Sequence, residues 1–175
     1  MHGQNPPCIC LQQIAALCPM KIEAREDIRD IFSIFHDGGI AAASIQANTL
    51  VLDIEIQYLA ERVKPEYKGF KIYLYGFSDV EFSTWPSDLK SAPEKIRDIQ
   101  SIFSPELEVL EANLKENSIE VVCNQHSSAY DYCGGELSFQ VDSAAVQDES
   151  GKFYTIDELD ILCKDYWDEW ASKNE

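Results

Sequence analysis

Residues 50–58 of the chain have the sequence LVLDIEIQY, and every second side chain from Leu50 to Tyr58 is large and apolar. The positions between them are mostly polar, and side chains of a β-strand point alternately to its two faces. This alternation therefore predicts a strand with one buried face and one solvated face. Residues 40–46 precede it across a short link at Asn48, so the two segments together predict a β-hairpin.

A second strand is expected over residues 70–77, FKIYLYGF, which are apolar or aromatic on both faces. A strand of this kind is central and covered on both sides, or it presents one face to a partner. The segment 107–114 also favours a strand, although its Glu, Leu and Ala residues equally suit a helix. Further strands are predicted over residues 80–85, 119–123 and 136–142.

Two helices are expected before the last strand. An apolar stripe from Ile28 to Phe35 has the spacing of an amphipathic helix. The paired glycines Gly38 and Gly39 follow it and suit a left-handed helix end and a turn. A short middle helix is predicted over residues 94–103.

The C-terminal helix has the clearest start signal in the chain. Thr155 and Glu158 have the spacing of a capping box, in which each side chain accepts a hydrogen bond from the other residue's backbone. An apolar stripe follows, and we expect it to dock on the sheet through its aromatic side chains. The stripe consists of Leu159, Leu162, Cys163, Tyr166 and Trp170, with Trp167 beside it.

Together these elements predict an α+β fold with a mainly antiparallel sheet of several hairpins. An N-terminal helix, a short middle helix and a C-terminal helix packed on the sheet complete it. Residues 1–19 contain no Lys, Arg, Asp or Glu, and we interpret them as an uncharged N-terminal extension. Residues 20–175 are the single expected domain, and no internal repeat is visible in the sequence.

The charge of the chain limits its expected partners. It carries 31 acidic and 14 basic residues, a formal net charge of −17. Such a charge repels phosphate backbones and anionic lipid, so we expect neither nucleic acid nor a membrane surface as partner. A basic protein fits better. A chain of this size does not need its six cysteines as a disulfide framework, and no signal peptide is visible. We therefore expect a cytoplasmic protein with reduced thiols and no cofactor.

The candidate binding residues are one tryptophan and several acidic side chains. Acidic side chains attract Lys and Arg, and Trp is a favoured anchor at protein interfaces. The candidates are Trp85, Asp131, Glu136, Asp165, Asp168 and Glu169.

The densest set of reactive side chains lies between Cys123 and Glu136. Two thiols and an imidazole, from Cys123, His126 and Cys133, are suitable ligands for a zinc ion with an open fourth position. Their spacing matches no common zinc pattern. A thiol nucleophile at Cys133 with His126 as its base is another interpretation of the same segment.

The sequence contains no nucleotide-binding, nucleophile-elbow or zinc-protease motif, which favours a non-enzymatic function. Its size and acidity resemble, in general class only, those of small immunity proteins that neutralise secreted toxins. The leading hypothesis is thus an acidic protein that binds and inhibits a basic protein partner. The first alternative is a small metal-dependent or thiol hydrolase centred on the segment from Cys123 to Glu136. The second is a structural or scaffolding domain without a ligand.

Overall fold

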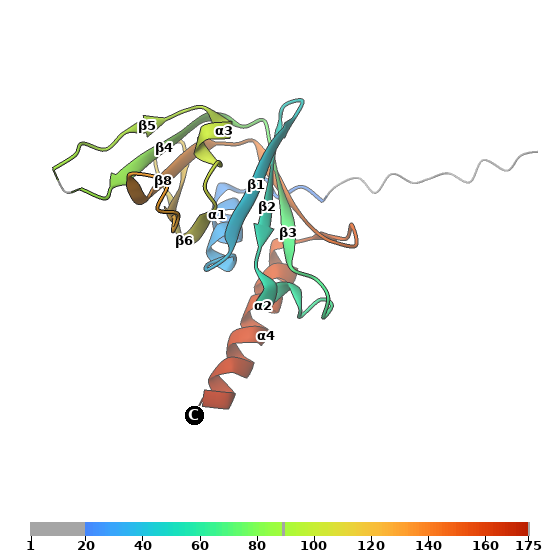
Figure 1. Cartoon of the computed structure of the whole chain (residues 1–175). Helices are drawn as coiled ribbons and strands as arrows, with labels where there is room; N and C mark the ends of the chain where they lie inside the picture. Colours follow the sequence, from blue (N-terminus) through green and yellow to red (C-terminus); the bar gives the residue numbers. More distant parts are fainter. Residues whose placement is uncertain (1–19, 89, 175) are drawn as a thin grey trace, which may run out of the picture.

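The computed structural model describes residues 20–88 and 90–174, which form one antiparallel sheet of ten strands and four helices (Figure 1). The strands are β1 (Gly39–Gln46), β2 (Thr49–Glu55), β3 (Gly69–Tyr75), β4 (Ser78–Pro86), β5 (Lys95–Ile96), β6 (Leu107–Leu114), β7 (Ile119–Asn124), β8 (Tyr132–Gln140), β9 (Ser143–Asp148) and β10 (Phe153–Tyr154). The helices are α1 (Arg25–Ile34), α2 (Gln57–Ala60), α3 (Ile99–Ile102) and α4 (Ile156–Asn174). The predicted α+β fold is confirmed. The predicted extension over residues 1–19 lies outside the described residues.

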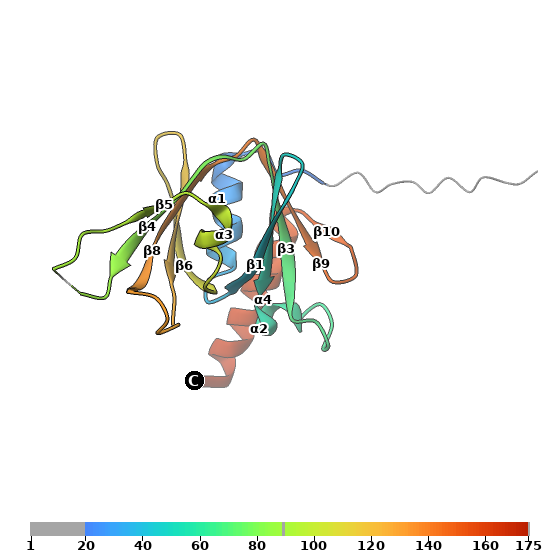
Figure 2. The same ribbon diagram turned by 45° about the horizontal axis from the view of Figure 1, so that its top comes forward.

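The sheet consists of two half-sheets that meet at a short junction (Figure 2). The first half-sheet has the strand order β10-β9-β3-β2-β1, and the second has the order β6-β7-β8-β4-β5. At the junction, β1 pairs with β6 through Gly39 with Glu108 and Ile40 with Leu107. The chain also crosses between the halves where β3 leads into β4 and where β8 leads into β9. The halves are therefore connected at both ends and share one core.

The two half-sheets have the same internal topology. Strands β1, β2 and β3 of the first half-sheet match β6, β7 and β8 of the second, and β9 and β10 of the first match β4 and β5 of the second. A helix precedes each run of five strands in the sequence, α1 before β1 and α3 before β6. The registers also agree, because a one-residue bulge follows Ile40 in β1 and Val109 in β6. This internal repeat was not visible in the sequence, because matching positions such as Leu52 and Val121 share apolar character rather than identity.

Two glycines support this equivalence. A Cβ atom at Gly69, which begins β3, would collide with the carbonyl oxygen of Ile54 in β2. At the matching place in the second half-sheet, a Cβ atom at Gly134 would collide with the carbonyl oxygen of Cys123 in β7. In both halves the third strand approaches the second so closely that only glycine fits.

Helix α1 joins the two half-sheets through the core. Phe32, fully buried, lies with its ring centroid 5.6 Å from that of Phe139 in β8, which belongs to the second half-sheet. One turn further on, Phe35 stacks at 5.2 Å on Phe70 of β3 in the first half-sheet. The apolar stripe predicted for this helix is thus confirmed, and it contacts both halves.

Several predicted boundaries need correction. The strand predicted over residues 50–58 ends at Glu55, because the chain turns there into α2. The helix predicted over residues 94–103 is shortened to α3, because β5 takes up its first part by pairing with β4. After α1 the left-handed residue is Asp37, with φ 64°, and not one of the paired glycines. Gly38 serves close packing instead, since a Cβ there would lie 2.8 Å from a carbonyl oxygen at the end of α1.

Candidate functional site

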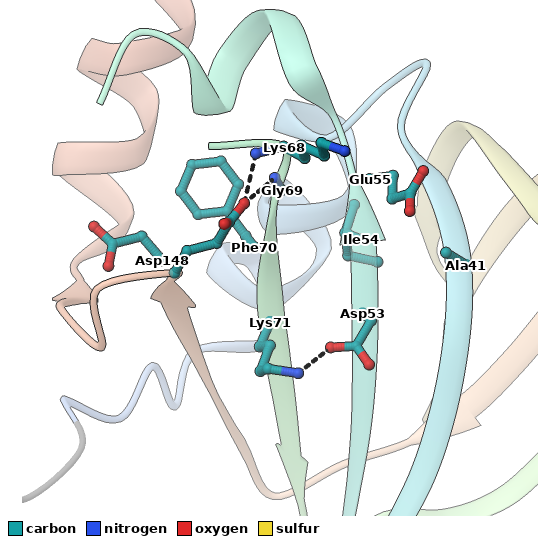
Figure 3. A pocket seen from close by; sticks show the side chains of 10 residues that line it. Ala41, Asp53, Ile54, Glu55, Lys68, Gly69, Phe70, Lys71 and Asp148 are labelled. Carbon is teal, nitrogen blue, oxygen red and sulfur yellow. Dashed lines mark hydrogen bonds and ion pairs between the residues drawn. The ribbon is translucent and has the colours of Figure 1, made fainter. Parts of the chain in front are cut away.

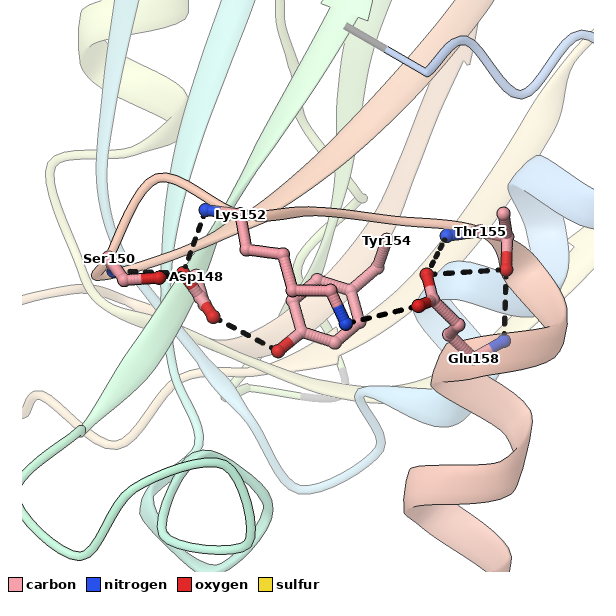
Figure 4. Close-up of polar contacts among 6 residues, drawn as sticks. All are labelled: Asp148, Ser150, Lys152, Tyr154, Thr155 and Glu158. Carbon is pink, nitrogen blue, oxygen red and sulfur yellow. Dashed lines mark hydrogen bonds and ion pairs between the residues drawn. The ribbon is translucent and has the colours of Figure 1, made fainter. Parts of the chain in front are cut away.

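The first turn of α4 is held by the predicted capping box (Figure 4). The backbone N–H of Thr155 donates to Oε2 of Glu158 at 2.9 Å, and the N–H of Glu158 donates to Oγ1 of Thr155 at 3.1 Å. The bond from the Thr155 backbone is the main reason that the pKa of Glu158 lies below its usual value. Lys152, whose Nζ lies 3.0 Å from Oε1 of Glu158, adds to this effect. The cap fixes the point at which α4 leaves the sheet.

The hairpin before α4 is organised around Asp148, which is buried at the end of β9 (Figure 4). Its Oδ1 accepts hydrogen bonds from the backbone N–H groups of Ser150 at 2.8 Å and Lys152 at 3.0 Å. Its Oδ2 accepts one from the hydroxyl of Tyr154 at 3.0 Å. Burial alone would raise the pKa of Asp148, but hydrogen bonds from the hydroxyls of Ser150 and Tyr154 and from the two backbone N–H groups outweigh it and lower the pKa. The ionised carboxylate therefore holds the β9–β10 hairpin together.

The first turns of α4 pack against the core of the protein. Leu159 is fully buried, and Leu162 and Cys163 are partly buried against the core. Further along, Trp167 and Trp170 are 41% and 51% exposed, and the helix extends away from both half-sheets (Figure 1). Its packing partners are mainly α1 and α2. The expectation that its aromatic side chains dock on the sheet was therefore wrong for the outer half of the helix.

An aromatic cluster surrounds the middle of α4. The ring of Tyr166 lies 4.4 Å from that of Tyr58 on α2 and 5.1 Å from that of Trp167. Trp170 continues the cluster, with its ring 5.9 Å from that of Trp167. A cavity of about 330 Å³ between α2 and α4 is lined by Tyr58, Tyr166 and Trp170 together with charged side chains. The cluster therefore offers exposed aromatic faces beside a shallow hollow.

An acidic groove lies on the side of α4 that faces α1. This groove, a cavity of about 550 Å³, is lined by Asp27 and Asp30 from α1 and by Asp157 and Asp160 from α4. Asp30 pairs with Arg29, with 2.6 Å between Oδ1 and Nε. The other three carboxylates have no ion-pair partner within residues 20–88 and 90–174. Three uncompensated negative charges therefore converge on one hollow.

Trp167 and Trp170 follow the groove along α4. Asp160, Cys163, Trp167 and Trp170 are spaced at i, i+3, i+7 and i+10, which places them along one face of α4. Burial and the neighbouring Asp160 carboxylate raise the pKa of the Cys163 thiol, in keeping with this arrangement. We call the α1–α4 groove and these two tryptophans the acidic–aromatic surface.

No protein family, curated protein or solved structure matches this chain. The chemistry of the acidic–aromatic surface is therefore the guide to its function. No helix within the described residues is long and apolar enough to cross a membrane.

The predicted binding residues on α4 lie near this surface but not within it. Asp165 and Asp168 are exposed, and the helical periodicity turns them away from the stripe of Asp160 and Trp167. Glu169 lines the aromatic cavity, but it forms ion pairs with Arg62 and Lys173. Its charge is largely compensated within the protein.

The other three predicted binding residues lie in the second half-sheet. Trp85 of β4 pairs with Gly134 of β8, and Glu136 lies diagonally opposite Trp85. Both side chains are on the face of the sheet opposite to the buried Phe82. Asp131 is exposed in the loop before β8, where its carbonyl oxygen accepts a hydrogen bond from Ser87 at 2.9 Å. These residues form a separate region that does not join α4.

The structure does not bring the three candidate metal ligands together. Cys123 is buried in the core, and this burial raises the pKa of its thiol to about 12. His126 is exposed, with Nε2 2.9 Å from a carboxylate oxygen of Glu108, and the thiol of Cys133 lies near the carbonyl oxygen of Trp85. Among residues 20–88 and 90–174, no group of three His, Cys, Asp or Glu side chains is placed to hold a metal ion.

A further cavity, of about 210 Å³, lies on the first half-sheet beside the bulge of β1 (Figure 3). Part of its charge is compensated from within. Lys71 pairs with Asp53, and Oε1 of Glu149 accepts hydrogen bonds from the backbone of Lys68 at 2.5 Å and Gly69 at 3.2 Å. Of the charged side chains that line it, Glu55 and Lys68 have no ion-pair partner within residues 20–88 and 90–174, and their charges are opposite. The unpaired groups of this cavity therefore do not concentrate one sign of charge as those of the acidic groove do.

The acidic groove was missed at the level of the sequence, although a signal for it exists. Asp27 and Asp30 on α1 have the same i, i+3 spacing as Asp157 and Asp160 on α4, so each pair lies on one helix face. The contact between the two helices is what brings the pairs together, and it cannot be derived from spacing within either helix.

Proposed function

We propose that this protein binds a basic protein partner through the acidic–aromatic surface. The observation that carries the proposal is the convergence of Asp27, Asp157 and Asp160 on one groove, with the exposed Trp167 and Trp170 further along α4. Uncompensated carboxylates in a hollow attract Lys and Arg side chains. Exposed Trp rings supply apolar contact area and interact favourably with cations above their faces.

The charge of the whole chain supports the same type of partner. A formal net charge of −17 accelerates encounter with a cationic protein and opposes contact with nucleic acid or anionic lipid. Such steering weakens as salt screens the charges, over a Debye length of about 8 Å at physiological ionic strength. Association is therefore expected to slow markedly at high salt, whereas dissociation is expected to change less.

We further propose that this binding takes place in the cytoplasm. Cys123, Cys133 and Cys163 are free thiols, which suits a reducing compartment. Inhibition of the partner is the functional consequence we favour, because a projecting helix with an acidic groove at its base is able to cover a basic cleft. Fractionation of source cells followed by thiol labelling tests the compartment. Recovery of the protein in an oxidising compartment, with these thiols blocked, would contradict it.

The test of binding compares two charge reversals on the same helix. Asp160→Lys places a cation in the groove, while Asp168→Lys makes the same change of charge outside it. Proteins retained by the immobilised wild type from source cells are identified, and the most basic one is purified for kinetic measurements. We expect Asp160→Lys to lower its association rate about tenfold or more, and Asp168→Lys to lower it about twofold or less.

A second variant separates the aromatic contribution from the electrostatic one. Trp167→Ala together with Trp170→Ala is expected to accelerate dissociation and to change the association rate little. Two results would overturn the proposal. One is that no retained protein is basic, and the other is that Asp160→Lys binds the purified partner as well as Asp168→Lys does.

A further inference from the structure

The edge of β1 that faces away from β2 is open. Beyond the junction, residues 42–46 form backbone hydrogen bonds only in the ladder with β2, as far as the described residues extend. Their side chains are small or exposed, and Ile45 is a large apolar residue that is 53% exposed. Unpaired N–H and C=O groups along such an edge are a template for a further strand.

The cause of this opening is visible in the matching strand. β6 also bends away from the junction at its bulge, but α1 packs along it, so Ala112 beyond the bulge is buried. The element in the matching place beside β1 is α3, a helix of four residues instead of ten. Both views show α3 beside only a part of β1 (Figures 1 and 2). The rest of the strand projects without cover.

This edge also lacks the charges that usually protect an exposed strand. Residues 38–52 contain no Asp, Glu, Lys or Arg, although the chain as a whole carries a net charge of −17. Natural edge strands commonly carry Lys or other charged side chains that prevent pairing with another chain. The β1–β2 hairpin is therefore a place where two copies of this acidic protein can approach without opposing carboxylates.

We propose that the open edge of β1 pairs with β1 of a second copy of this chain, in an antiparallel register centred on Ser44. Antiparallel pairing about this residue places Ile45 of each copy beside Ala43 of the other, so a large side chain meets a small one. Ala42 of each copy then lies opposite Gln46 of the other. The backbone N–H and C=O groups of the two β1 edges then pair with each other. No open β1 edge remains for a third copy, so the assembly is a closed twofold dimer.

The experiment uses the full chain and has two arms. Sedimentation velocity from about 1 µM to about 200 µM should show a monomer passing into a dimer, more completely at high salt because screening reduces repulsion between the copies. In the second arm, Ser44→Cys should form a disulfide between the two copies under mild oxidation, because opposite residues in an antiparallel pair lie at a suitable distance. Peptide mapping should locate the cross-link at position 44, and Ala42→Cys should give none.

A matched pair of variants completes the test. Ser44→Lys places a charge on the open edge and should remove the dimer, even though it lowers the repulsion between copies. Asn113→Lys makes a similar change at the matching position of β6 and should leave dimerisation unchanged. A monomer at every concentration would overturn the proposal and would leave the edge for a strand of another protein. A dimer that survives Ser44→Lys and forms no cross-link at position 44 would also overturn it.

Discussion

The two half-sheets share one topology but differ in how their junction strands are covered. β6 is covered by α1, which has ten residues, whereas β1 has beside it the four-residue α3. Ala112 of β6 is buried, while the matching Ala43 of β1 is only half-buried. Ile45 is 53% exposed, while its counterpart Leu114 is half-buried. The longer helix beside β6 thus covers a strand whose counterpart in the first half-sheet stays exposed.

The halves differ in a second way where each ends. β5 is followed by the short α3, and β10 is followed by α4, a helix of 19 residues. The repeated strands form the shared core, while both surfaces proposed for binding lie where the repeat is broken. One is the projecting α4 with its groove against α1, and the other is the uncovered edge of β1.

The largest expected effect tests the role of α1 as the link between the halves. Phe32→Ala removes a fully buried ring that packs on Phe139 and should lower the free energy of unfolding by about 3–5 kcal/mol. Ser33→Ala, on the exposed side of the same helix, should change it by less than about 0.5 kcal/mol. Urea unfolding of both variants measures the difference. Equal effects would mean that α1 does not join the halves as described.

A smaller effect tests the equivalence of the halves. Gly69→Ala and Gly134→Ala each introduce a Cβ atom against a backbone carbonyl oxygen. Each should lower the free energy of unfolding by about 1–3 kcal/mol, the usual range for a forced steric overlap. The two values should be similar, because the glycines occupy matching places. A neutral result at one position, with a large cost at the other, would show that the close approach is not shared.

How much of the fold and of the candidate site could be predicted depends on how far apart in the sequence the contacting residues lie. The hairpin around Asn48 and the capping box at Thr155 and Glu158 were predicted, because both depend on neighbouring residues. The exposure of Trp167 and Trp170 was not predicted, because an apolar stripe does not show where along a helix its packing partner ends. Among the candidate site residues, Asp165 and Asp168 lie on the helix next to the acidic–aromatic surface.

The cysteine and histidine candidates show the same limit. Cys123, His126 and Cys133 are close in sequence, but alternation along β7 directs Cys123 into the core while the other two stay outside. Asp27 and Asp160 are far apart in sequence and meet only because α1 and α4 pack together. A search for residues close in the sequence thus suggested a metal site whose ligands do not meet, and it missed the acidic groove.

A pH-dependent effect distinguishes two equivalent hairpins. In the β9–β10 hairpin Asp148 accepts a hydrogen bond from the backbone of Lys152 at 3.0 Å, and in the β4–β5 hairpin Thr84 accepts one from Glu94 at 2.9 Å. The pKa of Asp148 is lower in the folded protein than its usual value near 4. Its stabilising contribution is therefore fully present above about pH 4 and is lost as the pH falls through the lowered pKa.

Replacing Asp148 by the residue of the matching hairpin tests this difference. Asp148→Thr should make unfolding less sensitive to pH below about pH 4, because a hydroxyl group does not titrate there. Thr84→Ala should lower the free energy of unfolding by the same amount at every pH, because Thr84 does not titrate. Urea unfolding at a series of pH values gives both slopes. An unchanged acid slope in Asp148→Thr would mean that other carboxylates dominate acid unfolding.

The smallest expected effect concerns the part of α4 that has no counterpart in the other half. Asp168 is exposed, and the outer half of its helix extends away from both half-sheets (Figure 1). Asp168→Lys should therefore change the free energy of unfolding by less than about 0.5 kcal/mol, as surface substitutions usually do. Asp131→Lys, in the exposed loop before β8, is the matched control and should behave alike. If Asp168→Lys is clearly more destabilising than Asp131→Lys, the outer half of α4 contributes to the fold, and its exposed tryptophans are not reserved for a partner.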